Sequence, residues 1–380
     1  MPKRRYGSAE MSPELFRWAV IGTGAVSTKF VHGLAAAGRR ARADLVIARR
    51  EDSARRFAAG FGIPRHAAGL APDALTPGIL ADVDAVYVAS PVSEHAAHAL
   101  AAIAAGKPVL VEKPFAMNAA EAAQVADAAR AAGVFCMEAL WTRFQPLTAR
   151  LRDLVAAGEL GEVTGFDGGF QIATRRDPGA SLFDPARGGG ALMQRGIYPL
   201  SLACHLLGPV ADLSACGRIG PTGVDEDCAL ILRHTSGALS TIRAGLTSDG
   251  PNAATITGTR ATLHLAAPIW RPASARLVPA RPNTAGGFAG AGGRLASWRE
   301  SGPAQRLAQD LAPLKARLAG RSGRRIAAPF AGNGYVHEAL ELMRAVAAGE
   351  GESTIMPLDE SVAIMALLDA ARTQIHGEHA

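Results

Sequence analysis

Cysteine is scarce in this chain of 380 residues, and the few cysteines follow no ligand or disulfide pattern. No C-x-x-C pair and no zinc-type spacing of cysteine and histidine occurs. A disulfide framework and a structural zinc site are therefore both excluded, and a reducing, cytoplasmic setting is expected. The four cysteines are Cys136, Cys204, Cys216 and Cys228.

Long hydrophobic runs are missing as well. No run approaches the ~18 uncharged apolar residues that a membrane span needs, and the basic N-terminus has no apolar core of the signal-peptide type. We therefore expect neither a membrane span nor a signal peptide. Aromatic residues make up only 5% of the chain but hydrophobic residues make up 48%, which is typical of a globular protein. This length favours two domains.

Acidic residues are fewer than basic ones, and the formal net charge is +6. Residues 271–325 alone contain eleven basic side chains and two acidic ones, so the rest of the chain is mildly acidic. We interpret the Gly/Pro/Arg-rich region at about 271–330 as an exposed insertion. A site for nucleic acid or for a membrane surface is the less favoured interpretation, so we expect neither partner.

A glycine turn follows the first apolar run. Residues 17–21 predict a strand, and Gly22-Thr23-Gly24-Ala25-Val26-Ser27 leads from it into an amphipathic segment that ends near Gly38. Gly22 permits a tight turn, and Gly24 lets a diphosphate approach the backbone at the start of a helix. Ser27 stands where a third glycine or an alanine is usual.

Short apolar runs then alternate with alanine-rich helical segments, which predicts parallel βαβ units. Ligands bind beyond the carboxyl ends of such strands, so the residues that follow them are the candidates for chemistry. The expected strands are 45–48, 85–89, 109–111 and 134–137.

The second strand bears on the choice of cofactor. It ends in Arg49-Arg50, and basic residues there accommodate the 2′-phosphate of NADP, whereas an acidic residue binds the ribose of NAD. NADP(H) is therefore favoured. NAD(H) stays open because Glu51 and Asp52 follow directly.

The second half of the chain has a different pattern. Short strands joined by glycine-containing turns predict a mainly antiparallel open sheet in an α+β domain. We therefore expect an α/β protein with a Rossmann domain at 14–142 and an α+β substrate and oligomerisation domain at 143–380. The expected strands are 163–172, 228–233, 238–243, 253–257 and 261–265, and the closing helices lie near 335–349 and 358–375.

Two runs carry a resemblance to a known family. Residues 83–95, with Ser90, Pro91 and His95, and residues 104–114, which end in Glu112-Lys113-Pro114, resemble the glucose-fructose oxidoreductase / inositol dehydrogenase / MocA (Gfo/Idh/MocA) family. The stretches 137–144, 188–199 and 334–358 look most like its dimeric dihydrodiol dehydrogenase branch. The resemblance covers residues 17 to about 270 and 331 to 375.

The resemblance implies NAD(P)-dependent hydride transfer at a carbon that bears a hydroxyl, on a sugar, cyclitol or trans-dihydrodiol. It makes Lys113 the acid–base residue and gives Tyr198 a part in proton transfer. The family commonly has an aspartate where this chain has Gln194, which can orient a hydroxyl but carries no charge. It also implies a homodimer or homotetramer.

The resemblance further implies which residues contact each ligand. Trp141, Arg143, Phe144 and Tyr198 are expected on the substrate side. Metal binding is not expected, because His95 and His98 have no third ligand at a matching spacing. The expected cofactor residues are Gly22, Thr23, Gly24, Ala25, Val26, Arg49, Arg50, Ser90, Pro91, His95, Glu112 and Lys113.

Two other functions stay open from the sequence. One is a redox-assisted glycoside-cleaving enzyme of the same family, which returns its hydride and shows no net redox change. The other is a cofactor-binding regulator without catalysis, for which Gln194 is the support.

Overall fold

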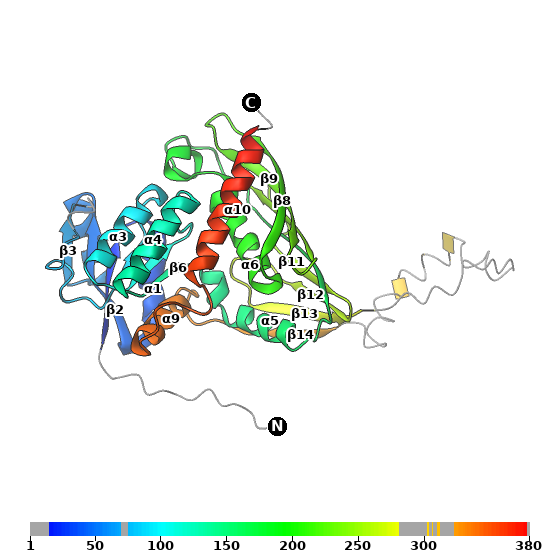
Figure 1. The fold of residues 1–380 in the computed structure, drawn as a ribbon, viewed down its shortest axis with the longest axis horizontal. Coiled ribbons are helices and arrows are strands. Elements are labelled where there is room, and N and C mark those ends of the chain that lie inside the picture. The colour runs from blue at the N-terminus through cyan, green and yellow to red at the C-terminus, as the bar shows by residue number, and fades with distance from the viewer. Residues whose placement is uncertain are drawn as a thin grey trace, which may run out of the picture.

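The computed structural model describes residues 15–69, 75–280 and 323–377, together with five positions between 302 and 311. The described residues form two sheets that lie side by side, each covered by helices (Figure 1). In this part of the chain, no helix has the length and apolarity that crossing a bilayer requires.

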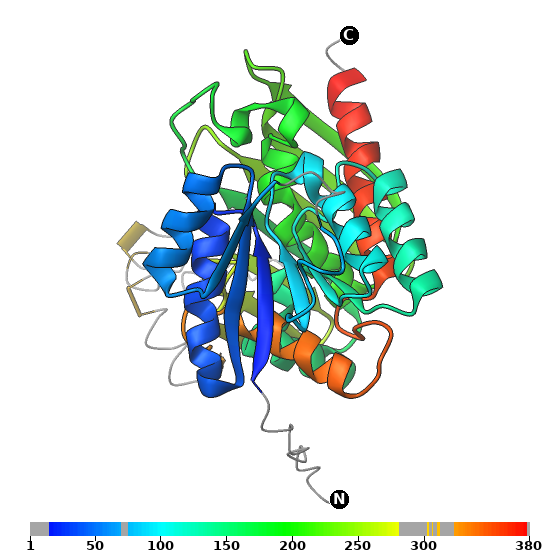
Figure 2. The same cartoon turned by 90° about the vertical axis from the view of Figure 1, so that its left-hand side faces the viewer.

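The first sheet has six strands in the order β3-β2-β1-β4-β5-β6, and every pair is parallel. Helices flank both of its faces (Figure 2). Because the strand order reverses at β1, this is the doubly wound arrangement predicted for a Rossmann domain. Its strands are β1 (Phe16–Ile21), β2 (Ala41–Ala48), β3 (Arg65–Ala68), β4 (Ala85–Val88), β5 (Val109–Glu112) and β6 (Cys136–Ala139). Its helices are α1 (Ala25–Leu34), η1 (Ala35–Arg40), α2 (Glu51–Phe61), η3 (Val92–Glu94), α3 (His95–Ala104) and α4 (Ala119–Ala132).

Two expectations about this sheet are wrong in detail. The strand expected at 134–137 begins two residues later, as β6, so that Glu138 lies inside the strand instead of after it. The edge strand β3 was not predicted. It has only four residues, Arg65–Ala68, and two of them are Arg and His, so it has no apolar run of the kind that predicts a strand.

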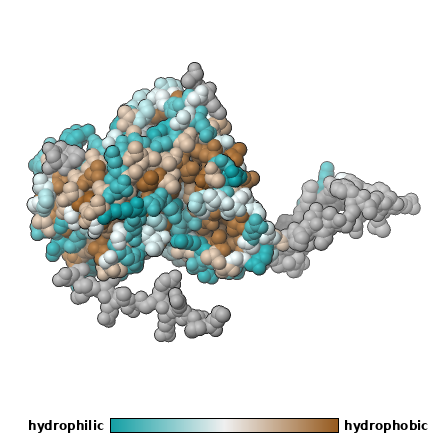
Figure 3. All heavy atoms as spheres, viewed as in Figure 1, coloured by the Kyte–Doolittle hydropathy of each residue, from teal (hydrophilic) through white to brown (hydrophobic). Residues whose placement is uncertain are grey.

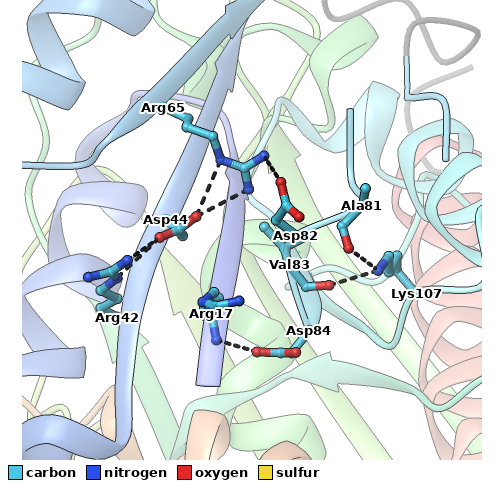
Figure 4. A network of polar contacts seen from close by, with 9 residues as sticks. All are labelled: Arg17, Arg42, Asp44, Arg65, Ala81, Asp82, Val83, Asp84 and Lys107. Atoms are coloured by element: carbon cyan, nitrogen blue, oxygen red, sulfur yellow. Dashed lines mark hydrogen bonds and ion pairs between the residues drawn. The ribbon is translucent and has the colours of Figure 1, made fainter. Parts of the chain in front are cut away.

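Polar side chains hold the sheet together on the side opposite the carboxyl ends (Figure 4). Asp44 in β2 is buried and accepts hydrogen bonds from Arg42 at 2.7 Å and from Arg65 at 3.1 Å. The backbone N–H of Arg17 donates to Asp84 at 2.6 Å, which joins the start of β1 to the residue before β4. The carboxyl ends of the strands are left for ligands.

The second sheet has eight strands in the order β14-β13-β12-β11-β7-β10-β9-β8. Only the pair β7 and β10 is parallel, so the prediction of a mainly antiparallel sheet is confirmed. The strands are β7 (Val163–Gln171), β8 (Val210–Ile219), β9 (Asp225–His234), β10 (Leu239–Gly245), β11 (Ala254–Gly258), β12 (Ala261–Leu265), β13 (Ser274–Pro279) and β14 (Arg324–Ala327). The helical segments are η4 (Trp141–Phe144), α5 (Pro146–Ala156), η5 (Ser181–Phe183), η6 (Pro185–Arg187), the π-turn η7 (Leu192–Gly196), α6 (Ile197–Leu207), α9 (Val336–Ala347) and α10 (Leu358–Gly377).

The expected insertion at about 271–330 needs correction at both ends. β13 and β14 belong to the sheet and pair with each other, so the chain leaves the sheet after β13 and returns to it at β14. Most residues between these strands, including the leucine stripe at 307–318, lie outside the described part of the chain. β8 was also not predicted, because most of its residues are half-buried or exposed and show no apolar periodicity.

Helices cover one face of the second sheet, and none of the helices in the described ranges covers the other face. Buried side chains such as Leu230 and Ile242 alternate along β9 and β10 with exposed ones, among them Ile231 and Leu239. Figure 3 shows hydrophobic residues gathering on the part of the surface that this sheet occupies.

The last helix, α10, packs against both β8 and α4. The carboxylate of Asp369 in α10 accepts a hydrogen bond at 2.8 Å from the backbone N–H of Ala119, the first residue of α4. The other C-terminal helix, α9, also contacts the first domain, since it packs against α1. The two C-terminal helices therefore join the domains.

Candidate functional site

The glycine turn after β1 has the geometry that dinucleotide binding needs. Gly22 has a φ of +107°, and a Cβ there would lie 2.4 Å from the carbonyl oxygen of Ala89. Gly24 precedes α1, and no side chain caps that helix end. A Cβ on Gly24 would meet nothing within 4 Å, so the N–H groups of Ala25 and Val26 begin the helix beside open space. This arrangement suits an anion.

A cavity of about 460 Å³ opens beside this turn. It brings together most of the predicted cofactor residues from three strand ends, and it also includes two residues of the second domain that were not predicted, Ser181 and Arg187. The lining residues are Gly22, Thr23, Gly24, Ala48, Arg49, Arg50, Ser53, Ala89, Ser90, Pro91, Ser93, Glu94, Ser181 and Arg187.

The two acidic residues after Arg50 pair with side chains outside the cavity. Glu51 pairs with His66 at 2.9 Å and Asp52 pairs with Arg55 at 2.6 Å. Arg50 donates a hydrogen bond to Ser53 at 3.3 Å, and both Arg49 and Arg50 are exposed. The charge that this end of β2 offers to a ligand is therefore positive.

His95 lies behind the cavity instead of lining it. Its ring nitrogens lie 2.8 Å from the carbonyl oxygen of Pro114 and 2.9 Å from that of Ser90. Burial lowers the pKa of His95 to about 4, and His98 lies 3.0 Å from the Ser90 hydroxyl. His95 therefore lies between two strand-end loops, and as a neutral ring it donates a hydrogen bond to only one of the two carbonyl oxygens. Although it was predicted among the cofactor residues, it is not part of the cavity lining.

Lys113, Gln194 and Tyr198 meet at the end of β5. The ammonium of Lys113 donates to the side-chain oxygen of Gln194 at 3.1 Å and to its backbone oxygen at 3.2 Å. The same nitrogen lies 5.2 Å from the centre of the Tyr198 ring. The turn of π-helix before α6 supplies Gln194, and the first turn of α6 supplies Tyr198.

Burial shapes the chemistry of these groups. It lowers the pKa of Lys113, against the opposing effect of the carboxyl groups of Glu112 and Glu138. Burial also raises the pKa of Tyr198, so its phenol stays protonated at neutral pH. An amine that changes its charge more easily than usual therefore lies beside a phenol that can donate a hydrogen bond.

Glu112 is not part of the cavity lining, although it was predicted among the cofactor residues. Its carboxylate accepts from the Tyr87 hydroxyl at 2.5 Å and from the backbone N–H of Lys113 at 3.1 Å. Burial raises its pKa. Near it lies Glu338 of α9, which is fully buried, has no hydrogen-bond partner among the described residues, and has a pKa far above the usual value.

An aromatic wall flanks the three residues. Trp141 stacks on Tyr335 with ring centres 4.5 Å apart, and Phe170 stacks on Trp270 at 3.9 Å. Phe170 also lies 5.4 Å from Tyr198. Tyr335, Phe170 and Trp270 were not predicted. No signal in the sequence places them here, because the stacked partners are far apart along the chain.

Arg143 does not reach this site, and the expectation that it contacts substrate is not supported by its geometry. Its side chain is fully buried and pairs with the carboxylate of Glu360. It also donates to the hydroxyl of Ser201 at 2.7 Å and to the backbone oxygens of Ser201 and Ile355. Phe144, its neighbour, is buried in the core.

Arg195 is the buried cation that sequence reasoning missed. It follows Gln194, and its guanidinium lies 5.6 Å from the centre of the Phe170 ring. It donates to Thr174 at 2.5 Å and to the backbone oxygens of Ile172 and Gly245. Within the described ranges, no group of three or more His, Cys, Asp or Glu side chains is arranged to hold a metal ion.

Comparison with known proteins agrees with this geometry. Residues 16–140 match the model of the GFO_IDH_MocA oxidoreductase family with its NAD-binding Rossmann fold, and residues 148–264 match the GFO/IDH/MocA C-terminal domain. The trans-1,2-dihydrobenzene-1,2-diol dehydrogenase of Sus scrofa is 32% identical over 259 residues, covering 67% of this chain and 76% of the relative. D-xylose 1-dehydrogenase (NADP(+)) of Hypocrea jecorina is 31% identical over 323 residues, covering 78% and 75%.

Solved structures share the whole fold. Levoglucosan dehydrogenase in complex with NADH and levoglucosan superimposes with a TM-score of 0.77 at 19% identity, over 96% of this chain and 98% of that one. A 3-ketoreductase from Actinomadura kijaniata in complex with NADP gives 0.74 at 24% identity, over 95% and 98%. The resemblance noted in the sequence is confirmed: the chain belongs to the GFO/IDH/MocA family of NAD-binding oxidoreductases.

Proposed function

We propose that this oxidoreductase transfers a hydride between NADP(H) and a hydroxyl-bearing carbon of a sugar, cyclitol or trans-dihydrodiol. The observation that carries the proposal is the meeting of Lys113, Gln194 and Tyr198 at the end of β5. This strand neighbours β4, whose carboxyl end lines the cavity. Relatives named as dihydrodiol and D-xylose dehydrogenases support the substrate class.

Lys113 is the proposed acid–base residue. When bound, the nicotinamide supplies the hydride acceptor or donor. In the direction of oxidation the neutral amine of Lys113 takes the proton of the substrate hydroxyl, and in the direction of reduction its ammonium returns that proton. The lowered pKa of Lys113 suits this exchange, because less free energy separates its two protonation states near neutral pH.

Tyr198 and Gln194 orient the groups that exchange this proton. The Tyr198 phenol, protonated because of burial, is the proposed donor to the substrate oxygen. Gln194 is fixed by a 2.8 Å hydrogen bond from its side-chain N–H to the carbonyl oxygen of Gly188. Its side-chain oxygen therefore points at Lys113, which favours a working site over the loss of catalysis that a regulator would have.

The preference for NADP(H) over NAD(H) rests on the end of β2. Arg49 and Arg50 line the cavity, and the two acidic residues that follow them are paired with His66 and Arg55. A 2′-phosphate gains charge-assisted hydrogen bonds from the two guanidinium groups. Fluorescence titration with NADPH and NADH tests this part, and equal affinity for the two would contradict it.

The aromatic wall favours cyclic substrates. Stacked pairs such as Phe170 with Trp270 offer flat apolar surface, and the axial C–H groups of a sugar ring or the ring of a dihydrodiol pack well against it. Turnover on a panel of aldoses, inositols and cyclic trans-diols, followed through NADPH absorbance, tests the class. Release of sugar from a glycoside without net cofactor turnover would instead favour the glycoside-cleaving alternative.

A homodimer through the open sheet face is part of the proposal. Exposed Ile231 on β9 and Leu239 on β10 present apolar surface on a face that no helix of the described chain covers. Covering such side chains in a subunit interface is favourable. Light scattering on the protein and on an Ile231→Asp variant tests it, since a dimer built on this face is expected to dissociate in the variant.

A further inference from the structure

A segment of the second domain reaches into the cofactor cavity. The short helical turns η5 and η6 supply Ser181 and Arg187 to a cavity otherwise lined by the Rossmann domain. η6 packs against η3, the turn that follows β4. Arg187 is thus a cation brought to this cavity by the fold, far in sequence from the glycine turn and from Arg49-Arg50.

Two hydrogen bonds within the protein fix the orientation of the Arg187 guanidinium without a ligand. Its Nε donates to the carboxylate of Asp184 at 2.7 Å, and its Nη2 donates to the carbonyl oxygen of Gly179 at 2.7 Å. Asp184 is itself fixed, because its other oxygen accepts from the backbone N–H of Ala186 at 3.0 Å. The third nitrogen, Nη1, has no hydrogen-bond partner among the described residues, so one donor group of a positioned fork stays available.

Close packing holds the segment against the Rossmann domain. Gly188 has a φ of +73°, and a Cβ there would lie 2.9 Å from the Cβ of Val92 in η3 and 3.2 Å from the sulfur of Met117. Gly189 shapes the segment itself, since a Cβ there would lie 2.7 Å from the carbonyl oxygen of Leu182 in η5. The close approach of the segment to η3 therefore depends on Gly188, the residue that follows Arg187.

The position of Arg187 indicates which phosphate group of a dinucleotide it can reach. The sheet order is β2-β1-β4, so the glycine turn after β1 lies between the ends of the other two strands. Arg49 and Arg50 follow β2, on the side of the adenosine ribose. The turn that carries Arg187, η6, packs on the opposite side, against η3 after β4. Arg187 lines the same cavity as Gly24, where the uncapped start of α1 suits a diphosphate.

We infer that Arg187 donates a hydrogen bond to the diphosphate of the bound dinucleotide, so that the second domain supplies part of the cofactor site. The inference rests on the proposed cofactor binding. Because NADPH and NADH share the diphosphate, the contribution of Arg187 is the same for both, whereas that of Arg50 differs between them.

Dissociation constants measured by fluorescence titration test this inference without relying on turnover. Arg187→Gln is expected to weaken the binding of NADPH and of NADH by a similar factor, about tenfold for one charge-assisted contact. Arg50→Gln is expected to weaken NADPH binding far more than NADH binding. Arg175→Gln, an exposed arginine of the same segment outside the cavity lining, serves as the matched control and is expected to leave both constants unchanged.

The outcomes separate the inference from the proposed function. Wild-type affinity of Arg187→Gln for both dinucleotides overturns the inference, and a loss confined to NADPH overturns the assignment to the diphosphate. If the wild-type protein binds neither dinucleotide, the proposed function fails first. Thermal melting of each variant without cofactor verifies folding, and Arg187→Lys, which keeps the charge but loses the fork, is expected to bind with intermediate affinity.

Discussion

The ammonium of Lys113 lies 3.1 Å from the side-chain oxygen of Gln194, a neutral amide, at the position where the family commonly has an aspartate. The amide accepts the hydrogen bond but adds no negative charge beside the amine. The charge state of Lys113 is therefore governed by burial and by the more distant carboxyl groups of Glu112 and Glu138.

Lys113→Ala is expected to lower kcat/KM by about a thousandfold, within the range typical of a lost acid–base residue. NADPH binding is expected to persist, because the cavity is lined by other residues. Stopped-flow reduction of the cofactor and fluorescence titration measure the two effects. Turnover that survives the substitution would disprove the proposed role.

Gln194→Asp is expected to move the pH profile of alcohol oxidation. A carboxylate beside Lys113 stabilises the ammonium and raises its pKa, so the neutral base forms only at higher pH. The acidic limb of kcat/KM should therefore shift upward, by about one pH unit.

Gln194→Asn is the control for that shift. Asn has the same side-chain length as Asp but no charge. The acidic limb of kcat/KM in this variant should therefore stay near the wild-type pH, even if activity falls. Equal shifts in both variants would mean that geometry, not charge, sets the pKa of Lys113.

Replacing both Arg49 and Arg50 by Ala is expected to reduce the preference for NADPH over NADH by at least about tenfold. The change should appear in the dissociation constant of NADPH, with that of NADH nearly unaffected. Arg56→Ala is the control, because Arg56 is an exposed arginine of α2 that does not line the cavity, and its removal leaves the pair of Arg55 with Asp52 intact.

Arg143→Met is expected to destabilise the fold by about 2 kcal/mol, because it leaves the backbone oxygens of Ser201 and Ile355 without this donor. The carboxylate of Glu360 adds little to the loss, since it is 44% exposed and stays hydrated. Urea unfolding measures the loss. Arg152→Met, on an exposed position of the neighbouring helix α5, is expected to change stability by less than about 0.5 kcal/mol. A raised KM with unchanged stability would restore Arg143 as a substrate residue.

Asp44→Ala is expected to cost about 1–2 kcal/mol, since it removes the buried acceptor of both Arg42 and Arg65. Asp52→Ala removes an ion pair in which both side chains are more than half exposed, and is expected to cost less than about 0.5 kcal/mol. Thermal melting of the two variants compares them. An equal loss of stability in the two variants would mean that burial does not strengthen the contribution of the Asp44 contacts.

Local motifs were sufficient to predict the glycine turn and the strand ends around it, which line the cavity. Gly22 and Gly24 sit in a strand–turn–helix pattern whose spacing is set by backbone geometry, and Lys113 follows a short strand directly. Arg143 lay in an equally suggestive stretch, but its direction depends on Ser201 and Glu360, which are far away in sequence. No local pattern contains that information.

Contacts between distant segments account for the other residues that were missed. Arg187 enters the cavity only because η6 packs on η3, and Glu338 lies near Glu112 only because α9 returns to the first domain. Tyr335 lies in the stretch 334–358 that carries the family resemblance, yet its stacking partner Trp141 follows β6, almost two hundred residues earlier in the sequence. Such pairs are set by the tertiary fold.

The path of α10 has a consequence for how the protein is made. The N-terminal domain emerges from the ribosome long before residues 358–377, yet α4 is covered by this helix, and the N–H of Ala119 is capped by its Asp369. A nascent chain therefore exposes one face of α4 until residues 358–377 have left the ribosome. Translation that stops short of α10 should leave a Rossmann domain with an uncovered helix, a species open to chaperones and proteases.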